Sequence, residues 1–449
     1  MKGTASPEHI STRLRQIAEL ARSKPALVFT GLNHHIDMEL LEEAYRRTRK
    51  DGAVGVDGQT ADAYAENLES NLQGLIERVH QGRYHAPPVR RVHIPKGDGS
   101  KTRPIGIPTF EDKVLQRAVA MLLEAIYEQD FLDCSFGFRP GRSPHAALDA
   151  LREGTMRMGG GVVIDADIKA FFDTLSHQRL NELLDRRVRD GVVRRLIQKW
   201  LHAGVLDQGV VTHPDTGTPQ GGVISPLLAN IYLHEVLDAW FHAEVKPRLR
   251  GEALLIRYAD DFVIVCTDEV DAERILAVLP KRFGRYNLTL HPEKTRKVPF
   301  RRPPYRRPGA PWPAGEGPET FDLLGFTHYW GRTRKGGWAI MVKTASSRFT
   351  RALKRVADWV KQNRHRPVTE QHRTLVQKLR GHFNYYGVTC NGRALSRFAY
   401  EVACRWKKWL GRRSQKAAIT KERFRAFLAR FPLPTPVLGR SVYRSAANP

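Results

Sequence analysis

The sequence predicts a mixed α/β (α+β) protein, in which an antiparallel sheet flanked by helices is followed by an α-helical C-terminal domain. Two apolar runs enclose an acidic tip in LLIRYADDFVIVC (254–266), the pattern of a buried hairpin. A third apolar run, GVVID, starts at residue 161 and is also typical of a strand. From about residue 345, apolar residues recur at helical spacing instead. They form two predicted faces, one with Phe349, Leu353, Val356, Trp359 and Val360, the other with Leu395, Phe398, Val402, Trp406, Trp409 and Leu410.

The remaining elements follow from caps, turn residues and periodicity. Expected helices cover residues 37–50, 66–80 and 110–130, a stretch beginning near Ser143, the apolar stretch after TGTPQGG, and the stretch beginning DAERILAV at residue 271. Expected strands cover two runs within 87–108, joined by a KGDGSK turn into a basic hairpin, and FDLLGFTHYW at 321–330. Residues 299–319 are rich in Pro, Arg and Gly and are interpreted as an exposed insertion or, alternatively, a domain boundary.

Composition narrows the class of protein. With 449 residues and 41% hydrophobic content, the chain can form two or three domains with sizeable cores. No run approaches the roughly 18 apolar residues of a membrane span, and the N-terminus lacks the apolar segment of a signal peptide, so we expect a cytoplasmic protein with no membrane partner. The four cysteines are widely separated and form no CxxC pair, which favours free thiols over a zinc site or disulfides.

Positive charge is concentrated at the C-terminal end. The net charge is +26, and residues 343–449 carry 25 Lys and Arg against 4 Asp and Glu, whereas the preceding 342 residues carry only +5. Such a surface repels itself unless a polyanion compensates it. Nucleic acid is the favoured partner because phosphate neutralisation releases counterions. A membrane surface is the weaker alternative.

Three carboxylates are candidates for one site. Asp167 ends an apolar strand, and Asp260 and Asp261 form the tip of the later hairpin, so converging strand ends would bring them together. Hard oxygen ligands suit Mg²⁺, and two such ions about 4 Å apart stabilise the attacking and leaving oxygens of a phosphoryl displacement. The alternative is ordinary turn chemistry, in which adjacent aspartates are common.

Several further motifs favour the first interpretation. The tetrad at 258–261, YADD, resembles the polymerase signature of reverse transcriptases, and the chain resembles the bacterial group II intron reverse transcriptase/maturase family along nearly its whole length. The other blocks, in the family's order, are KTRPIGIPTFEDKVLQRAV, SFGFRPGRSPHAAL, DADIKAFFD, GTPQGGVISPLLANIYL, LTLHPEKTRKV, DLLGFTHYW and LRGHFNYYGV. The resemblance implies a right-hand polymerase: an N-terminal extension and the start of the fingers at 1–85, fingers and palm at 86–335, and a helical thumb/maturase domain with a basic tail at 336–449.

The same resemblance assigns roles to residues. Asp167, Asp260 and Asp261 would bind two Mg²⁺ ions in the palm, while Asp165 would be a neighbour and Asp173 structural. The nucleotide-binding residues implied for the dNTP are Lys96, Arg103, Phe172 and Gln220, and Lys294 is a weaker candidate for binding phosphate. Phe172 would exclude a 2′-hydroxyl and so favour deoxynucleotides, whereas Phe171 reads as a core residue. Lys96 and Arg103 could alternatively be simple exposed hairpin cations.

The C-terminal domain would grip nucleic acid. The expected RNA-binding residues are Arg380, His382, Tyr385, Tyr386, Arg405, Lys407, Lys408, Arg412 and Arg413. Packing within the helices is an equal alternative for Tyr385 and Tyr386, and Trp406 and Trp409 are expected in the core. No paired CxxC motifs follow the last thumb helix, so we expect the type of family member that lacks an endonuclease domain.

The predicted function is RNA-directed DNA synthesis from dNTPs on an RNA template with a DNA primer. The expected partners are group II intron RNA, bound as a maturase to promote splicing, and a DNA target for mobility. Two alternatives remain open: a splicing-only RNA-binding maturase, and a domesticated relative in antiviral defence or DNA repair. The sequence leaves the oligomeric state open between monomer and homodimer.

Overall fold

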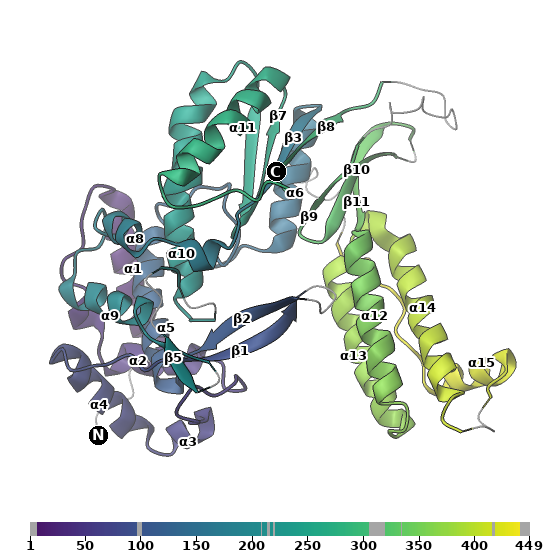
Figure 1. Cartoon of the computed structure of the whole chain (residues 1–449), viewed down its shortest axis with the longest axis horizontal. Coiled ribbons are helices and arrows are strands. Elements are labelled where there is room, and N and C mark those ends of the chain that lie inside the picture. Colours follow the sequence, from purple (N-terminus) through teal and green to yellow (C-terminus); the bar gives the residue numbers. More distant parts are fainter. Residues whose placement is uncertain are drawn as a thin grey trace. The chain divides into compact units, whose positions relative to one another are not determined.

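The computed structural model describes residues 7–96, 101–207, 209–212, 216–218, 221–304, 319–333, 335–414 and 418–440. The chain forms two compact units (Figure 1). Unit 1 combines Met1–Leu151 with Val162–Lys297, and unit 2 combines Arg152–Gly161 with Val298–Pro449. The predicted division between residues 335 and 336 remains a prediction about functional domains, because the compact units divide the chain elsewhere.

Unit 1 begins with helices packed around one central, buried helix. They are α1 (Pro7–Ser23), α2 (Met38–Arg47), α3 (Ala61–Ala65), α4 (Leu68–His80) and the central α5 (Phe110–Tyr127). Side-chain caps explain where three of them start, since Asp37, Thr60 and Thr109 each accept a hydrogen bond from a backbone N–H three residues later. Helix α5 is buried nearly all round, because α1, α2 and α3 contact it.

A four-stranded sheet carries the carboxylates. Its order is β6 (Ala253–Tyr258), β7 (Asp261–Cys266), β3 (Gly160–Asp167) and β8 (Arg296–Arg301). Strand β7 pairs antiparallel with both β6 and β3, and its Val263, Ile264 and Val265 are fully buried. Helix α11 (Glu269–Gly284) packs on β7 through the stacked rings of Phe262 and Phe283. The predicted hairpin and the predicted strand beginning at 161 therefore belong to one sheet.

A second sheet holds the basic hairpin. Its order is β2 (Lys101–Ile107), β1 (Val89–Lys96), β4 (Val205–Asp207) and β5 (Val210–Thr212). Strands β1 and β2 pair antiparallel from Arg90 opposite Ile107 to Lys96 opposite Lys101, as the sequence predicts for 87–108. Sequence reasoning missed β4 and β5, which have only three residues each. The short helix α7 (Phe171–Thr174) follows β3, where the sequence favours a turn or the start of a helix, whereas the next two helices in the chain, α8 (His177–Leu184) and α9 (Gly191–Leu201), were left unassigned.

Unit 2 joins a small sheet to a helical bundle. Strands β9 (Phe321–Leu323), β10 (Phe326–Arg332) and β11 (Trp338–Thr344) are antiparallel, and α12 (Ser346–Gln362), α13 (Val368–Tyr386), α14 (Gly392–Leu410) and α15 (Lys421–Arg430) follow. Trp406 is fully buried and its indole N–H donates to Gln371 (3.0 Å), which confirms its place in the core, whereas Trp409 is half-buried. Of the predicted insertion, residues 305–318 lie outside the described residues.

The predicted fold class is confirmed: an antiparallel sheet flanked by helices precedes a helical region. Strand β11 and helix α1 were not predicted. Throughout the described ranges, every helix is too short or too polar to cross a lipid bilayer.

Candidate active site

The strand register brings Asp167 beside the hairpin tip. Asp167, the last residue of β3, lies directly opposite Asp261, the first residue of β7. Residues directly opposite in an antiparallel pair project their side chains from the same face, with Cβ atoms about 5 Å apart. Asp260 occupies the two-residue turn that separates Tyr258 from Asp261. Carboxylates that are almost a hundred residues apart in sequence therefore lie together at the ends of neighbouring strands.

The turn itself has an unusual backbone. Ala259 adopts a left-handed conformation (φ 57°), which is uncommon for a residue with a Cβ, and its side chain is buried. Gly137 packs against it so closely that a Cβ at Gly137 would lie 2.3 Å from the Ala259 nitrogen. The conformation that presents Asp260 is thus fixed by contact with a neighbouring loop.

Cations surround the carboxylates on β3. The Lys294 ammonium hydrogen-bonds Asp167, and the Arg296 Nε donates to Asp165 Oδ2 (3.1 Å). The His291 N–H donates to the Asp167 carbonyl (2.7 Å) and ties the loop that carries Lys294 to the end of β3. Lys294, the weaker candidate for binding phosphate, therefore hydrogen-bonds the predicted metal-binding carboxylate. Asp173 is exposed on α7, apart from this pair of contacts.

The three aspartates are candidate ligands for a divalent ion. In the part of the chain that the structure describes, no three His, Cys, Asp or Glu side chains lie close enough to hold a metal ion together. The chemistry and the placement nevertheless fit, since three hard carboxylate donors share one sheet edge. Lys294 contributes a positive charge to Asp167 in this arrangement. A magnesium ion would have to displace that ammonium.

Phe172 is held in place by a neighbouring loop. Its ring is half-buried and meets the buried ring of Phe171 edge to face at 5.3 Å. The Thr218 N–H donates to the Phe172 carbonyl (2.8 Å), and Gly217, with φ 87°, approaches the same carbonyl. The predicted core position of Phe171 is confirmed. Gln220, two residues beyond Thr218, lies outside the described residues.

The loop after Gln220 rests on α5. The Gln116 side-chain oxygen accepts a hydrogen bond from the Val223 N–H (2.8 Å), and Thr218 donates to Ser225 Oγ (2.7 Å). On the other side, Gly221 contacts the backbone of β2 at Gly106. Sequence reasoning missed Gln116, because a glutamine on an amphipathic helix carries no recognisable signal.

The basic hairpin carries its predicted ligands near the far end. Lys96 ends β1, and its side chain lies outside the described residues, while Arg103 on β2 is exposed opposite Ile94. A further basic residue, Arg90, instead donates to the Val54 carbonyl (2.7 Å) and has a structural contact. Arg103 is therefore accessible to a ligand.

Four of the predicted RNA ligands are engaged by packing or by bonds to the backbone of unit 2. The Tyr385 hydroxyl donates to the Leu324 carbonyl (2.8 Å), and the Tyr386 ring lies 5.0 Å from that of Phe326. His382 stacks on Phe398 (3.9 Å), where burial lowers its pKa to about 4 and keeps it neutral. Arg413 donates to the backbone carbonyls of Arg364 and Arg366, between α12 and α13. These contacts favour the packing alternative for the two tyrosines.

The other predicted RNA ligands lie at the surface of the helices. Arg405 pairs with Glu401 one turn earlier (3.1 Å). Lys408 and Arg412 both lie over the Trp409 ring, and both are exposed. The remaining two are Arg380, exposed on α13, and Lys407, half-exposed on α14. Their contact with RNA stays a prediction.

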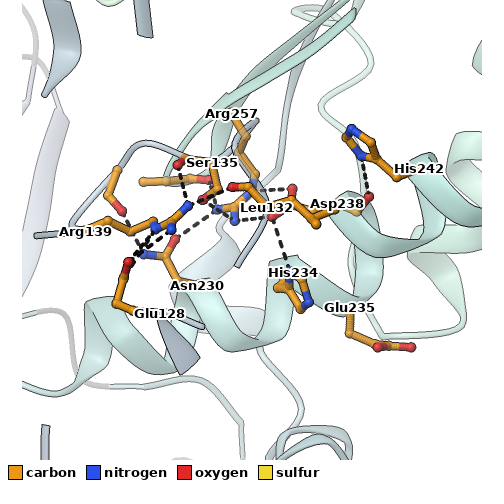
Figure 2. A network of polar contacts seen from close by, with 12 residues as sticks. Glu128, Leu132, Ser135, Arg139, Asn230, His234, Glu235, Asp238, His242 and Arg257 are labelled. Atoms are coloured by element: carbon orange, nitrogen blue, oxygen red, sulfur yellow. Dashed lines mark hydrogen bonds and ion pairs between the residues drawn. The ribbon is translucent and has the colours of Figure 1, made fainter. Parts of the chain in front are cut away.

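One buried charge escaped the sequence reasoning. Arg257 lies within the apolar strand β6, directly before the YADD tetrad, and its side chain is completely buried. Figure 2 shows it bonded to Asp238, Ser135 and Asn230. The sequence signal that could have revealed it is a charged residue inside an otherwise apolar strand.

An antiparallel sheet that presents carboxylates at adjacent strand ends is the arrangement of a template-directed nucleotidyltransferase. Residues 94–328, just over half of the chain, match the family described as "Reverse transcriptase (RNA-dependent DNA polymerase)". The chain therefore belongs to the reverse transcriptase family.

Individual relatives refine this class. Protein YkfC of Escherichia coli (strain K12) is 36% identical over 327 residues, covering 65% of this chain and 84% of YkfC. Group II intron-encoded protein LtrA of Lactococcus lactis subsp. cremoris is 44% identical over 229 residues, covering 50% of this chain but only 37% of LtrA. An uncharacterised 91 kDa protein in the cob intron of Schizosaccharomyces pombe is 33% identical over 239 residues, covering 52% and 29%. The predicted resemblance and enzyme class are confirmed.

Proposed function

We propose that this chain synthesises DNA on an RNA template, with Asp167, Asp260 and Asp261 as the carboxylates of the reaction centre. The observation that carries the proposal is the register that sets Asp167 opposite Asp261 at the hairpin tip. Two Mg²⁺ ions bound to these carboxylates would stabilise the attacking 3′-oxygen and the leaving pyrophosphate. The turn residue Asp260 completes the set from its position next to the left-handed Ala259.

The substrate of this site is a dNTP paired with the template base. The Phe172 ring, whose backbone carbonyl accepts a hydrogen bond from the Thr218 N–H, would collide with a 2′-hydroxyl and so select deoxynucleotides. The Arg103 guanidinium, exposed on β2, would offset charge on the triphosphate as a bidentate donor. Lys96 at the end of the same hairpin and Gln220 would contact the same nucleotide, and Lys294, once released from Asp167, would reach its phosphates.

The basic helices of unit 2 supply the second part of the proposal. Nearly all charges on α12 to α15 are cationic, and two of the four acidic residues in 343–449 are engaged in ion pairs. An exposed cationic surface of this kind suits the phosphates of an RNA duplex or a folded RNA. Because two relatives are named for introns, we propose group II intron RNA as that partner, with splicing and mobility into a DNA target as the outcome, in the cytoplasm.

Primer extension tests the reaction centre. Purified chain is given an RNA template, a DNA primer, dNTPs and Mg²⁺, and extension by the wild type is compared with that of Asp260→Asn. Losing a carboxylate that offsets several kcal/mol of transition-state charge reduces the rate by about a thousandfold. Asp173→Asn is the matched control, because Asp173 is an exposed aspartate on α7. We expect this variant to extend the primer at the wild-type rate. Equal extension by wild type and Asp260→Asn refutes the assignment.

A binding experiment tests the RNA partner separately. Labelled group II intron RNA and an unrelated structured RNA of equal length are titrated with the chain at the same salt concentration. The proposal expects tighter binding of the intron RNA and faster splicing when the chain is present. Equal affinity for both RNAs, with no effect on splicing, would contradict the maturase role and leave the polymerase assignment untouched.

A further inference from the structure

Arg257 places a permanent positive charge inside the sheet, three residues before Asp260. Its side chain is completely buried at the end of β6, between apolar neighbours in the strand. A buried guanidinium is costly unless it is paired and all its N–H groups find acceptors. The identity and position of those acceptors therefore indicate what Arg257 does.

All five donors of Arg257 have partners. Asp238 receives two parallel hydrogen bonds, from Nε (2.8 Å) and from Nη2 (2.5 Å), in the bidentate geometry of a strong charge-assisted pair. Nη2 also donates to Ser135 Oγ (2.7 Å), and Nη1 donates to Asn230 Oδ1 (2.9 Å). The fifth bond runs from Nη1 to the carbonyl oxygen of Ala259 (3.1 Å). One side chain thus links the loop at Ser135 and the helical segment that carries Asn230 and Asp238 to the turn.

Asp238 is a matching buried anion. It lies on the wide helical segment His234–Ala239 that continues α10 (Ser225–Leu233), and its side chain is fully buried. His234 Nδ1 lies 4.0 Å away, beyond hydrogen-bonding distance, and burial lowers the pKa of His234 so that it is neutral. Arg257 is consequently the cation that balances Asp238 (Figure 2).

The network also fixes the loop that presses on the catalytic turn. Arg257 exchanges backbone hydrogen bonds with that loop, its N–H donating to Cys134 O (2.7 Å) and its carbonyl accepting from Phe136 N (2.9 Å). Asn230 Nδ2 donates to the Gly137 carbonyl (2.7 Å), and Gly137 is the residue that abuts Ala259. Arg139, also drawn in Figure 2, donates to the Leu132 (2.7 Å) and Ser135 (2.9 Å) carbonyls of the same loop.

Ala259 is therefore constrained from two directions. The Arg257 guanidinium holds its carbonyl from within the sheet, and the Gly137 backbone fills the space beside its nitrogen. A non-glycine residue in the left-handed region persists only when its surroundings determine it. Because a buried ion pair adds little net stability compared with apolar side chains, what this network provides is the geometry of the turn.

We propose that Arg257 and Asp238 are positioning residues that set the orientation of Asp260 and Asp261 through the Ala259 carbonyl. This inference rests on the proposed polymerase activity for its kinetic consequence, but its structural consequence is independent of activity. The guanidinium fork is required, because a lysine ammonium has only three donors and cannot reach Asp238 in bidentate fashion, Ser135, Asn230 and Ala259 together.

The test is Arg257→Lys, compared with a matched buried arginine. Arg187 also pairs with an aspartate, Asp130 (2.8 Å), and donates to backbone carbonyls, among them that of Pro25, so its bonds go to other segments than the turn. Arg187→Lys therefore reproduces the loss of a buried guanidinium fork in the same unit. For Arg257→Lys we expect kcat for primer extension to fall about ten- to a hundredfold, with the KM for dNTP changed by less than about threefold. For Arg187→Lys we expect kcat to be unchanged.

Hydrogen exchange gives a readout that needs no activity. In Arg257→Lys the amides of residues 258–262 exchange faster than in the wild type, whereas in Arg187→Lys they keep the wild-type rate. Wild-type kcat and exchange in Arg257→Lys, or equal losses in both variants, overturn the proposal. If Arg257→Lys does not fold, the double variant Arg257→Met/Asp238→Leu removes both charges and is judged by the same two measurements. If the wild-type chain does not extend the primer, the proposed function is wrong. Amide hydrogen exchange alone then decides whether Arg257 positions the turn.

Discussion

Asp112 provides a pH-dependent test of how unit 1 is built. It lies in the first turn of α5, 2% exposed, and accepts a hydrogen bond from the Tyr84 hydroxyl, which in turn accepts one from the Trp200 indole N–H (2.9 Å). Burial raises its pKa to about 7, although the Tyr84 hydrogen bond opposes that shift. The perturbation is Asp112→Asn, which keeps the shape and the acceptor oxygen but cannot ionise.

The direction of the effect follows from proton binding. The unfolded chain releases the Asp112 proton near pH 3.8, whereas the folded chain keeps it until about pH 7. Folded protein therefore binds one more proton between these values, and its stability falls as pH rises through that range. A difference of roughly three pKa units corresponds to about 4 kcal/mol. The wild type should lose about that much relative to Asp112→Asn between about pH 4.5 and pH 8.5, most of it below pH 7.

The assay is urea unfolding of both proteins at a series of pH values, followed by tryptophan fluorescence. Other titrating groups act alike in wild type and variant, so the difference in unfolding free energy isolates Asp112. Tyr84→Phe is a second arm: without the hydroxyl the folded carboxyl ionises at higher pH, so the fall in stability starts at the same pH but continues to a higher one. A free-energy difference between wild type and Asp112→Asn that stays constant with pH would refute the reasoning.

Four further outcomes are expected. Phe172→Ala should raise incorporation of ribonucleotides relative to deoxynucleotides by about tenfold or more, measured as the ratio of kcat/KM values; an unchanged ratio would contradict the role of Phe172 in excluding the 2′-hydroxyl. Lys294→Met frees Asp167 from its ammonium and should lower the Mg²⁺ concentration for half-maximal extension, by up to about fivefold for a partly exposed pair; a rise would contradict competition at that carboxylate. RNA affinity should fall about a thousandfold between about 50 and 200 mM salt if about six phosphates are contacted, and a flat profile in filter binding would count against the basic helices as the RNA surface. Arg412→Gln should reduce the slope of that profile by about one phosphate, while Arg413→Gln, whose guanidinium is bonded to backbone carbonyls, should leave the slope unchanged.

The carboxylate site could largely be predicted from the sequence. The apolar runs around Asp260 and Asp261 define a hairpin by local pattern, and Asp167 ends a run of the same kind. What the sequence could not give is that β3 pairs with β7, and in the register that sets Asp167 opposite Asp261. Strand pairing is a tertiary choice, and a slip of one residue would have turned Asp167 to the other face.

Other features were beyond sequence reasoning for physical reasons. Strands β4 and β5 are too short to show an alternation. The side-chain partners of Arg257 lie 19 to 122 residues away in the sequence, so the local pattern shows the charge but not its acceptors. The sequence around Tyr385 is the same whether this residue packs within the domain or contacts RNA. Only the structure, in which its hydroxyl donates to the Leu324 carbonyl, favours packing.

Unit 2 is assembled from two separate stretches of chain. The end of α6 (Pro144–Arg157) is hydrogen-bonded to strand β11 of its small sheet. Arg152 Nε donates to the Ile340 carbonyl (3.3 Å), and Met156 Sδ accepts from the Ile340 N–H (3.2 Å). A fragment that starts at Val298 would therefore lack part of its own folding unit. Exchanging this unit between relatives, in the laboratory or by recombination, requires replacing residues 152–161 along with everything after 297, and a single crossover point cannot transfer it whole.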